Sequence, residues 1–587
     1  MMLTPILMAA ALASDFHLPI QEVWHGKSEL LMQQQGPLIT EFELSGGLAS
    51  PNYQMTMEYV DKLVSVNPDI FALEIIGYSD QKRAIKMLKV TASKDKHQLN
   101  DKKPTLLIQA GIHSGEIDGK DAGFMLLRDI AVGDKKALLD KVNILFIPIL
   151  NVDGHERSSE FNRINQRGPV EMGFRTNAKN LNLNRDYTKL DTPEIRALVK
   201  VVNQYNPQLY LDIHVTDGAD YQYDVTYGFM PTFASESPKI STVLANDFRP
   251  KIDSQLHAMG HLPGDFVFLM DPRDLKQGLA GWVATPRYSN AWGDLRNLPT
   301  ILVENHSLKP YKQRVLGTYV FLEAVINTLA EQKDKLIAAV KFEQQNLPSQ
   351  LVVERGYSKE PDHIDFAGIS YEHFDSELTG HKEVRYTGKK QQFNKLPIYW
   401  QKDKKVVVDV PKAFYVPAQY PEVLQSLSLQ GIEYQTASEA ELSNLEQWAV
   451  NEFKFAALPF EGRMRVSASF DVRAASPDKS ISWYKVPTSQ PLGKLAVHLL
   501  HPQAQDSLFQ WGFFNTIFQR TEYVENYALE PYAKVMLAQN SKVKAEFDAK
   551  LADPAFANSA DARAAWLYKQ TPYYDQAYLQ YPILIER

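Results

Sequence analysis

The chain has 587 residues, more than a single hydrophobic core normally supports, so we expect at least two domains. Hydrophobic residues make up 44% and charged residues 23%, a balance typical of soluble globular proteins rather than disordered or membrane proteins. The formal net charge of -7 and the absence of a Lys/Arg-rich tract argue against nucleic acid as a partner. The sequence has no cysteine, which excludes disulfides, a thiol nucleophile and thiolate metal ligands.

The first 14 residues form an apolar segment that ends in Ala9-Ala10-Ala11-Leu12-Ala13. This ending has the small-residue cleavage pattern of a secretory signal, although the positive charge that usually precedes the apolar run is missing. We therefore expect a periplasmic or secreted protein, with an apolar N-terminal arm as the alternative. No later apolar run approaches the ~20 residues of a stable membrane span.

The next segments predict an α/β fold. Two apolar runs, 70–76 and 85–90, flank a polar turn and predict a β-hairpin. Later apolar runs have the length of buried strands and alternate with helix-length segments. The strands are expected at 105–110, 142–150, 209–213 and 300–303, and the helices include 119–130 and 193–205. This order predicts a mixed, mostly parallel sheet with helices on both faces and ligands at the carboxyl ends of its strands.

A change of composition predicts a domain boundary near residue 340, where a helix-like run at 330–341 gives way to a polar stretch at 344–362. Beyond it, alternation of period two and many aromatic residues predict strands, and helical spacing returns near the C-terminus. We expect an α/β domain at 15–340, a β-rich accessory domain at 341–500, and a helical C-terminal segment at 501–587 that packs on one of the two domains.

The first chemical motif lies between a predicted strand and a predicted helix. It reads Gly111-Ile112-His113-Ser114-Gly115-Glu116, so a His and a Glu three residues apart can reach one ion. Such a pair is also common on solvated surfaces and is weak evidence alone. A catalytic zinc site needs three protein ligands and one open position, so one further ligand has to be found.

His214 is a natural third ligand because it directly follows the predicted strand 209–213, at the edge of the sheet where ligands gather. His155 and His306 also follow strands and compete for the same role. Glu304 ends the strand 300–303, where a carboxylate can take a proton from metal-bound water and pass it to a leaving amine.

Further polar motifs lie between these residues: Asn151-Val152-Asp153-Gly154, Asn162-Arg163-Ile164-Asn165 and Leu183-Asn184-Arg185. A His-x-x-Glu after a strand, an Asn-x-Asp-Gly, an Arg-x-Asn, a Leu-Asn-Arg and a later strand-end His and Glu follow one another in this order. Together they resemble the zinc carboxypeptidase family related to carboxypeptidase A. The resemblance extends over about residues 40 to 340, so the C-terminal part lies outside the family's common catalytic domain.

The resemblance implies that His113, Glu116 and His214 bind one Zn²⁺ and that Glu304 is the general base. It also implies roles for the residues of the other motifs. Arg163 would stabilise the oxyanion, with Arg167 as the alternative, because a fixed guanidinium beside the metal can stabilise charge on the scissile oxygen.

By the same resemblance Asn184 and Arg185 would hold the terminal carboxylate of a substrate, a task suited to the planar fork of arginine. Tyr288 would correspond to the family's mobile tyrosine, although it lies closer to Glu304 in sequence than is usual. The chain also has Asn182 where the family often has an Asp that accepts a hydrogen bond from the first zinc histidine. We expect Asp153 or a backbone carbonyl to replace that acceptor, or zinc affinity to be weaker.

These features predict a zinc-dependent metallopeptidase that releases C-terminal amino acids, with a peptide bearing a free C-terminus as its partner. One alternative is a zinc-dependent amidohydrolase acting on cell-wall peptides or N-acyl amino acids. Another is a binding protein that retains the fold without turnover, against which the presence of Glu304 argues. No sequence feature indicates the preferred side chain or the oligomeric state.

Overall fold

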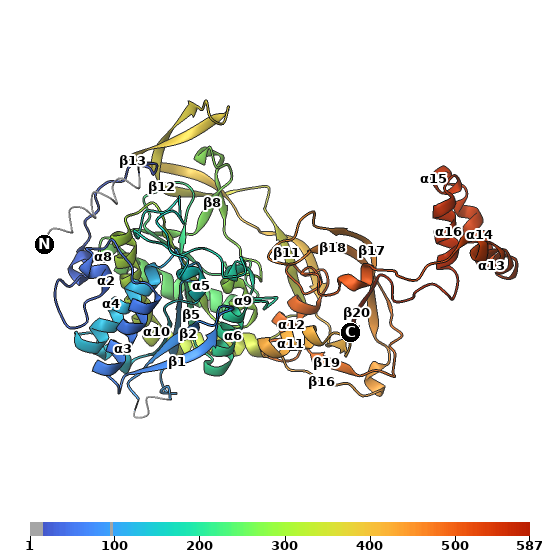
Figure 1. Ribbon diagram of the computed structural model, residues 1–587, viewed down its shortest axis with the longest axis horizontal. Helices are drawn as coiled ribbons and strands as arrows, with labels where there is room; N and C mark the ends of the chain where they lie inside the picture. Colours follow the sequence, from blue (N-terminus) through green and yellow to red (C-terminus); the bar gives the residue numbers. More distant parts are fainter. Residues whose placement is uncertain (1–15, 94–97) are drawn as a thin grey trace.

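The computed structural model describes residues 16–93 and 98–587 (Figure 1). The expected export signal at residues 1–14 lies outside the described residues. Within the described ranges, no helix has both the length and the apolar character required to cross a membrane.

The largest sheet is mixed and eight-stranded, and it confirms the predicted hairpin and strands. Its spatial order is β1 (Phe71–Tyr78), β2 (Ala84–Val90), β4 (Asn143–Ile147), β3 (Thr105–Ala110), β5 (Leu209–Thr216), β10 (Thr300–His306), β6 (Val225–Gly228) and β7 (Pro263–Asp265). The four central strands β4, β3, β5 and β10 run parallel, while β1, β2 and β6 join them by antiparallel pairing. These central strands are buried throughout, as expected for parallel strands covered on both faces.

Helices cover both faces of this sheet, because successive side chains of a strand point to opposite sides. Leu106 and Ile108 of β3 belong to a core formed with the first group of helices, whereas Leu107 belongs to a second core. The first group comprises α3 (Tyr53–Val66), α4 (Asp118–Val132), α7 (Pro238–Val243), α8 (Arg249–Ala258) and α10 (Tyr311–Gln345). The second core contains α6 (Pro193–Tyr205) and α9 (Ser289–Leu295). Short helices α2 (Glu41–Leu44) and α5 (Val152–His155) complete this part.

The C-terminal half is rich in strands, as predicted. A pair is formed by β11 (Gln350–Gly356) and β14 (Asp403–Asp409). The strands β12 (Asp362–Asp375) and β13 (Lys382–Tyr399) form a four-stranded sheet with β9 (Leu279–Gly281) and β8 (Val267–Leu269) of the first half. A six-stranded sheet has the order β16 (Gln435–Thr436), β19 (Trp483–Pro487), β15 (Ala413–Pro417), β20 (Gln580–Glu586), β17 (Glu446–Phe455) and β18 (Val466–Ala474). The second core continues into this half, where Phe414, Leu427 and Leu495 are fully buried.

The remaining helices divide into two groups. Two of them, α11 (Pro421–Gln430) and α12 (Gly493–Leu500), contact α6 and α9 of the first half. The other group, α13 (Asn526–Gln539), α14 (Ser541–Lys550), α15 (Pro554–Ala557) and α16 (Ala560–Lys569), stands away from the body of the molecule (Figure 1). After these helices the chain returns to form β20, an interior strand of the six-stranded sheet that the sequence pattern did not indicate.

A buried lysine joins the two halves. Lys494 on α12 is 1% exposed and donates hydrogen bonds to Glu343 Oε2 on α10 (2.9 Å), to Asn297 Oδ1 (3.0 Å) and to the carbonyl oxygen of Glu236 (2.6 Å). A buried charge is tolerated only when it is paired and hydrogen-bonded, and these acceptors provide that compensation.

We expect Lys494→Met to lower the free energy of unfolding by about 3–5 kcal/mol, because it leaves the Glu343 carboxylate buried without its cation. The measurement is urea unfolding followed by tryptophan fluorescence. Lys479→Met is the matched control, because Lys479 pairs with Glu439 on the exposed surface and should contribute less than about 1 kcal/mol. Equal unfolding curves for the two variants would contradict this assignment, and adding Glu343→Leu to Lys494→Met should recover part of the loss.

Candidate functional site

The predicted ligands converge at the carboxyl ends of neighbouring parallel strands. His113 lies in the turn between β3 and α4, and His214 lies on β5, which pairs directly with β3. Glu304 is placed opposite His214 in the register of β10 and β5. The turn after β3 begins at Gly111, whose φ of +65° favours glycine, and a Cβ there would lie 3.1 Å from Ile117 Cδ1. The left-handed backbone at this turn therefore favours glycine.

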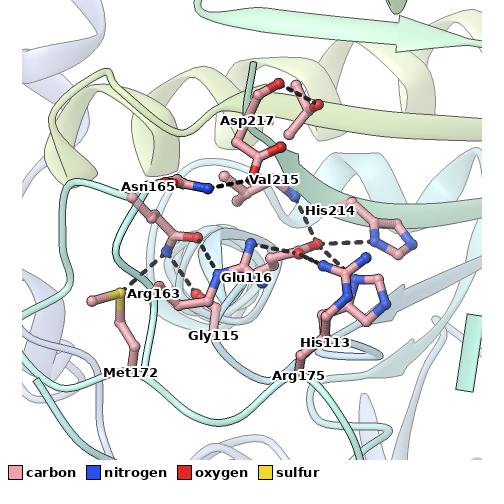
Figure 2. A network of polar contacts seen from close by, with 12 residues as sticks. His113, Gly115, Glu116, Arg163, Asn165, Met172, Arg175, His214, Val215 and Asp217 are labelled. Atoms are coloured by element: carbon pink, nitrogen blue, oxygen red, sulfur yellow. Dashed lines mark hydrogen bonds and ion pairs between the residues drawn. The ribbon is translucent and has the colours of Figure 1, made fainter. Parts of the chain in front are cut away.

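The Glu116 carboxylate is the meeting point of the two histidines (Figure 2). Its Oε2 lies 3.1 Å from His113 Nδ1 and 3.0 Å from His214 Nδ1. One nitrogen from each histidine and one carboxylate oxygen all lie within 4.8 Å of one another, and each residue is at most 2% exposed. Two imidazole nitrogens and a carboxylate oxygen are the donor set of one class of catalytic zinc site, so these residues fit a zinc ion.

The histidine ring of His113 is held by Asn182. His113 Nε2 lies 2.8 Å from Asn182 Oδ1, which leaves Nδ1 directed at Glu116. Asp153, one of the two expected replacements, does not take this role, because its carboxylate bonds instead to Ser79 Oγ (2.8 Å) and Arg83 Nη1 (2.7 Å). The amide at position 182 therefore serves as the acceptor itself, a role in which metal sites often use a carboxylate or backbone carbonyl.

The charges around His214 favour a cation at this position. His214 Nε2 lies 3.0 Å from Asp212 Oδ1 on the same strand, in an ion-pair contact. Burial alone would lower the pKa of His214, but the carboxylates of Asp212 and Glu304 outweigh burial and raise the pKa well above its usual value. The surroundings of His214 therefore favour positive charge at this position, which a bound divalent ion would supply.

Glu304 has the properties of a carboxyl group that can exchange a proton near neutral pH. It is 8% exposed, and burial, together with the nearby carboxylates of Glu116 and Asp212, raises its pKa to about 8. The positive charge of His214 acts in the opposite direction. A carboxyl group with a pKa near the working pH is suited to general acid–base catalysis.

Two arginines contact Glu116, the predicted Arg163 and also Arg175, which was not predicted. Arg163 Nη2 lies 2.7 Å and Arg175 Nη1 3.1 Å from Glu116 Oε1. The side chain of Arg163 is 11% exposed and bonds also to Gln166 Oε1, whereas that of Arg175 is 43% exposed. A signal for Arg175 was present, because Arg175-Thr176-Asn177 repeats the Arg-x-Asn pattern of Arg163.

Arg167, the alternative arginine, does not contact Glu116. It donates to the carbonyl oxygens of Leu308 (3.0 Å) and Pro19 (2.7 Å), so it ties the N-terminal segment to the loop after β10. The competing histidines have other partners as well. His155 contacts Lys120 and Glu156, and the ring of His306 stacks on Tyr221 at 4.0 Å.

The residues expected to hold a substrate carboxylate lie on one short helical turn, 183–185. Asn184 is buried, and its side-chain oxygen has no hydrogen-bond partner among the described residues. The guanidinium of Arg185 lies 4.5 Å from the ring centroid of Tyr288, and none of the ion pairs in the described part of the chain involves Arg185. The structure therefore brings Arg185 and Tyr288 together and leaves polar groups there available for a ligand.

Comparison with known proteins agrees with this geometry. Residues 56–266 match the model of the zinc carboxypeptidase family. This stretch of the chain is therefore similar to zinc carboxypeptidases. The matched range contains His113, Glu116 and His214 but ends before Glu304.

Several named proteins resemble parts of this chain. Carboxypeptidase 2 of Trichophyton rubrum is 26% identical over 174 residues, which cover 29% of this chain and 30% of that protein. Carboxypeptidase D of Rattus norvegicus is 28% identical over 156 residues, 25% of this chain and 11% of that protein. The crystal structure of carboxypeptidase A from Helicoverpa armigera has 14% sequence identity and a TM-score of 0.36, covering 57% of this chain and 80% of that one. The matches thus span 30% or less of the two curated relatives.

We expect the protein to bind one Zn²⁺ per chain and His214→Ala to weaken that binding at least about 100-fold. Loss of a residue that only orients a ligand costs ~10–100-fold in metal affinity, so loss of the ligand itself should cost more. Competition with a chromogenic chelator measures the affinity. His257→Ala is the control, because this histidine is exposed on α8 and far from the site in the chain. Unchanged zinc affinity in His214→Ala would exclude this histidine as a ligand.

Proposed function

We propose that the protein is a zinc-dependent metallocarboxypeptidase that removes C-terminal amino acids from peptides. The observation that carries this proposal is the meeting of His113 Nδ1 and His214 Nδ1 at the Glu116 carboxylate, with Glu304 on the neighbouring strand. A bound zinc ion would polarise the scissile carbonyl and lower the pKa of a water molecule, which supplies the nucleophile.

Glu304 carries the proton in this proposal. Its carboxylate accepts a proton from the attacking water and then delivers it to the leaving amine, so a single group serves as base and then as acid. Burial raises the pKa of Glu304, so its carboxylate is a stronger base than an exposed one and is suited to accepting the proton of the attacking water.

Arg175 is the better candidate for stabilising the oxyanion. Arg163 and Arg175 contact the same oxygen of Glu116, but the Arg175 side chain is 43% exposed while that of Arg163 is 11% exposed and also bound to Gln166. A guanidinium that reaches solvent can meet a substrate carbonyl, whereas a buried one with fixed partners is suited to holding Glu116 in place.

Arg185 and Asn184 would bind the terminal carboxylate of the substrate. None of the ion pairs among the described residues involves Arg185, and burial lowers its pKa while Glu461 acts in the opposite direction, so an incoming carboxylate would pair with a half-buried guanidinium. The stacking of Arg185 on Tyr288 fixes the plane of the guanidinium. This arrangement supports removal of terminal residues in preference to cleavage within a peptide.

We expect blocked dipeptides with a free C-terminal carboxylate to be hydrolysed and their amidated counterparts to be resistant. Glu304→Gln should lower kcat by ~10²–10⁴, the usual contribution of a general acid or base, while zinc stays bound. Steady-state kinetics on both substrates, with zinc content measured alongside, test this expectation. Equal turnover of the free and amidated substrates would contradict exopeptidase action, and turnover of N-acyl amino acids alone would favour a deacylase.

We expect Arg175→Ala to lower kcat by ~10²–10³, the typical cost of removing one donor to an oxyanion, with little change in zinc affinity. Arg163→Ala should instead reduce zinc affinity or stability, because it removes the more buried partner of Glu116. Comparing kcat and the zinc dissociation constant for both variants separates the two roles. The assignment is reversed if Arg163→Ala shows the larger loss of kcat with normal zinc affinity.

A further inference from the structure

The C-terminal half holds the segment 182–191, which contains both the orienting Asn182 and the proposed carboxylate-binding pair. Hydrogen bonds and an ion pair connect the C-terminal half to the segment 182–191 at four positions. The contacts are Glu461 Oε2 with Asn182 N (2.8 Å), Gln430 Nε2 with Tyr187 O (2.7 Å), Trp511 Nε1 with Thr188 Oγ1 (2.9 Å), and Arg463 Nη2 and Nε with Asp191 (2.6 and 2.7 Å). The segment is therefore positioned by residues remote from it in sequence.

Glu461 makes the contact that lies nearest to the proposed zinc ligands. It belongs to a tight turn between β17 and β18, in which Phe460 and Arg463 form an isolated β-bridge. Glu461 has a φ of +50°, and the next residue, Gly462, has a φ of +77°. A left-handed conformation at a residue other than glycine is unfavourable and persists only where the surroundings enforce it. Here the bond to Asn182 and the ion pair from Arg463 to Asp191 hold the turn in place.

We propose that Glu461 is a positioning residue for the zinc site, acting through Asn182 on His113. This inference rests on the proposed function. The Glu461 carboxylate accepts the backbone N–H of Asn182 at 2.8 Å, and the side-chain oxygen of Asn182 meets His113 Nε2 at 2.8 Å. Two consecutive hydrogen bonds therefore connect the C-terminal half to the imidazole whose other nitrogen faces Glu116.

Because residue 182 is an asparagine, the hydrogen bond between its backbone and Glu461 matters for the orientation of His113. A neutral amide polarises an imidazole less than a carboxylate does, so the ring orientation depends more on how firmly the amide is held. Asn182 Oδ1 also accepts the backbone N–H of Asn184 at 3.0 Å, which fixes the side chain relative to its own turn. A charge-assisted bond from Glu461 to the backbone of residue 182 then fixes that turn relative to the rest of the molecule.

The test compares zinc dissociation constants, measured by chelator competition on the full chain, for Glu461→Ala and Glu461→Gln. We expect Glu461→Ala to weaken zinc binding about tenfold, the lower end of the range for residues that orient a ligand. Glu461→Gln keeps an oxygen that can accept the Asn182 N–H, so it should restore most of the affinity. Glu452→Ala removes a carboxylate from an exposed position on the same β17–β18 hairpin and should leave zinc affinity unchanged.

A double-mutant cycle with Asn182→Asp distinguishes positioning from a general loss of stability. An aspartate at 182 supplies the acceptor charge directly, so Glu461→Ala should cost less in that background, and the two changes should be non-additive. Additive effects, or equal zinc affinity of Glu461→Ala and the parent chain, would overturn the positioning role and leave the proposed function intact. Failure of the parent chain itself to bind zinc would contradict the proposed function instead.

Discussion

The structure of the site depends on one buried carboxylate, that of Glu116. Its two oxygens meet two imidazole nitrogens, two guanidinium groups and the backbone N–H of Val215 at 3.1 Å. Burial alone would raise the pKa of Glu116, but His113 and Arg163 outweigh burial and hold the pKa well below its usual value. An ionised carboxylate can remain in so enclosed a place only because each of its oxygens is paired with donors.

The parallel sheet supplies the geometry that this carboxylate needs. Strands β3, β5 and β10 are adjacent and parallel, so the residues at their carboxyl ends meet at one edge of the sheet. His113 and Glu116 come from the turn after β3, His214 from β5 and Glu304 from β10. His214 and Glu304 are therefore placed by backbone pairing, whereas His113 and Glu116 are placed by the short turn that joins β3 to α4.

Local pattern was sufficient to predict the first hairpin and the central parallel strands of the eight-stranded sheet. The segment 193–205 matches α6, because Pro193 stands at the first turn and the apolar positions recur at helical spacing. The strand-end positions of His214 and Glu304 followed from short apolar runs. The strand β20 was missed because its short apolar run follows four helices in the chain, and the strands it pairs with lie more than 100 residues earlier.

Side-chain partners could not be predicted in the same way, because tertiary packing decides them. Two Arg-x-Asn motifs occur within thirteen residues of one another, and only the packed structure places Arg175 as well as Arg163 on Glu116. The contact between Asn182 and Glu461 spans 279 residues of sequence and involves a backbone N–H, which carries no side-chain signal. The sequence shows Asn182 where the resembled family often has Asp. It does not show that the amide oxygen of Asn182 itself meets His113.

The same packing bears on how the two halves of the chain depend on each other. The predicted boundary near residue 340 falls close to the end of α10, yet the second hydrophobic core extends from Leu107 and Leu198 to Leu427 and Ile585. Without the C-terminal half, α6 and α9 on one face of the sheet would lose the apolar contacts of α11 and α12. The segment 182–191 would lose its four remote contacts as well. The geometry of the proposed zinc site is therefore set by the whole chain, although its ligands all lie in the first half.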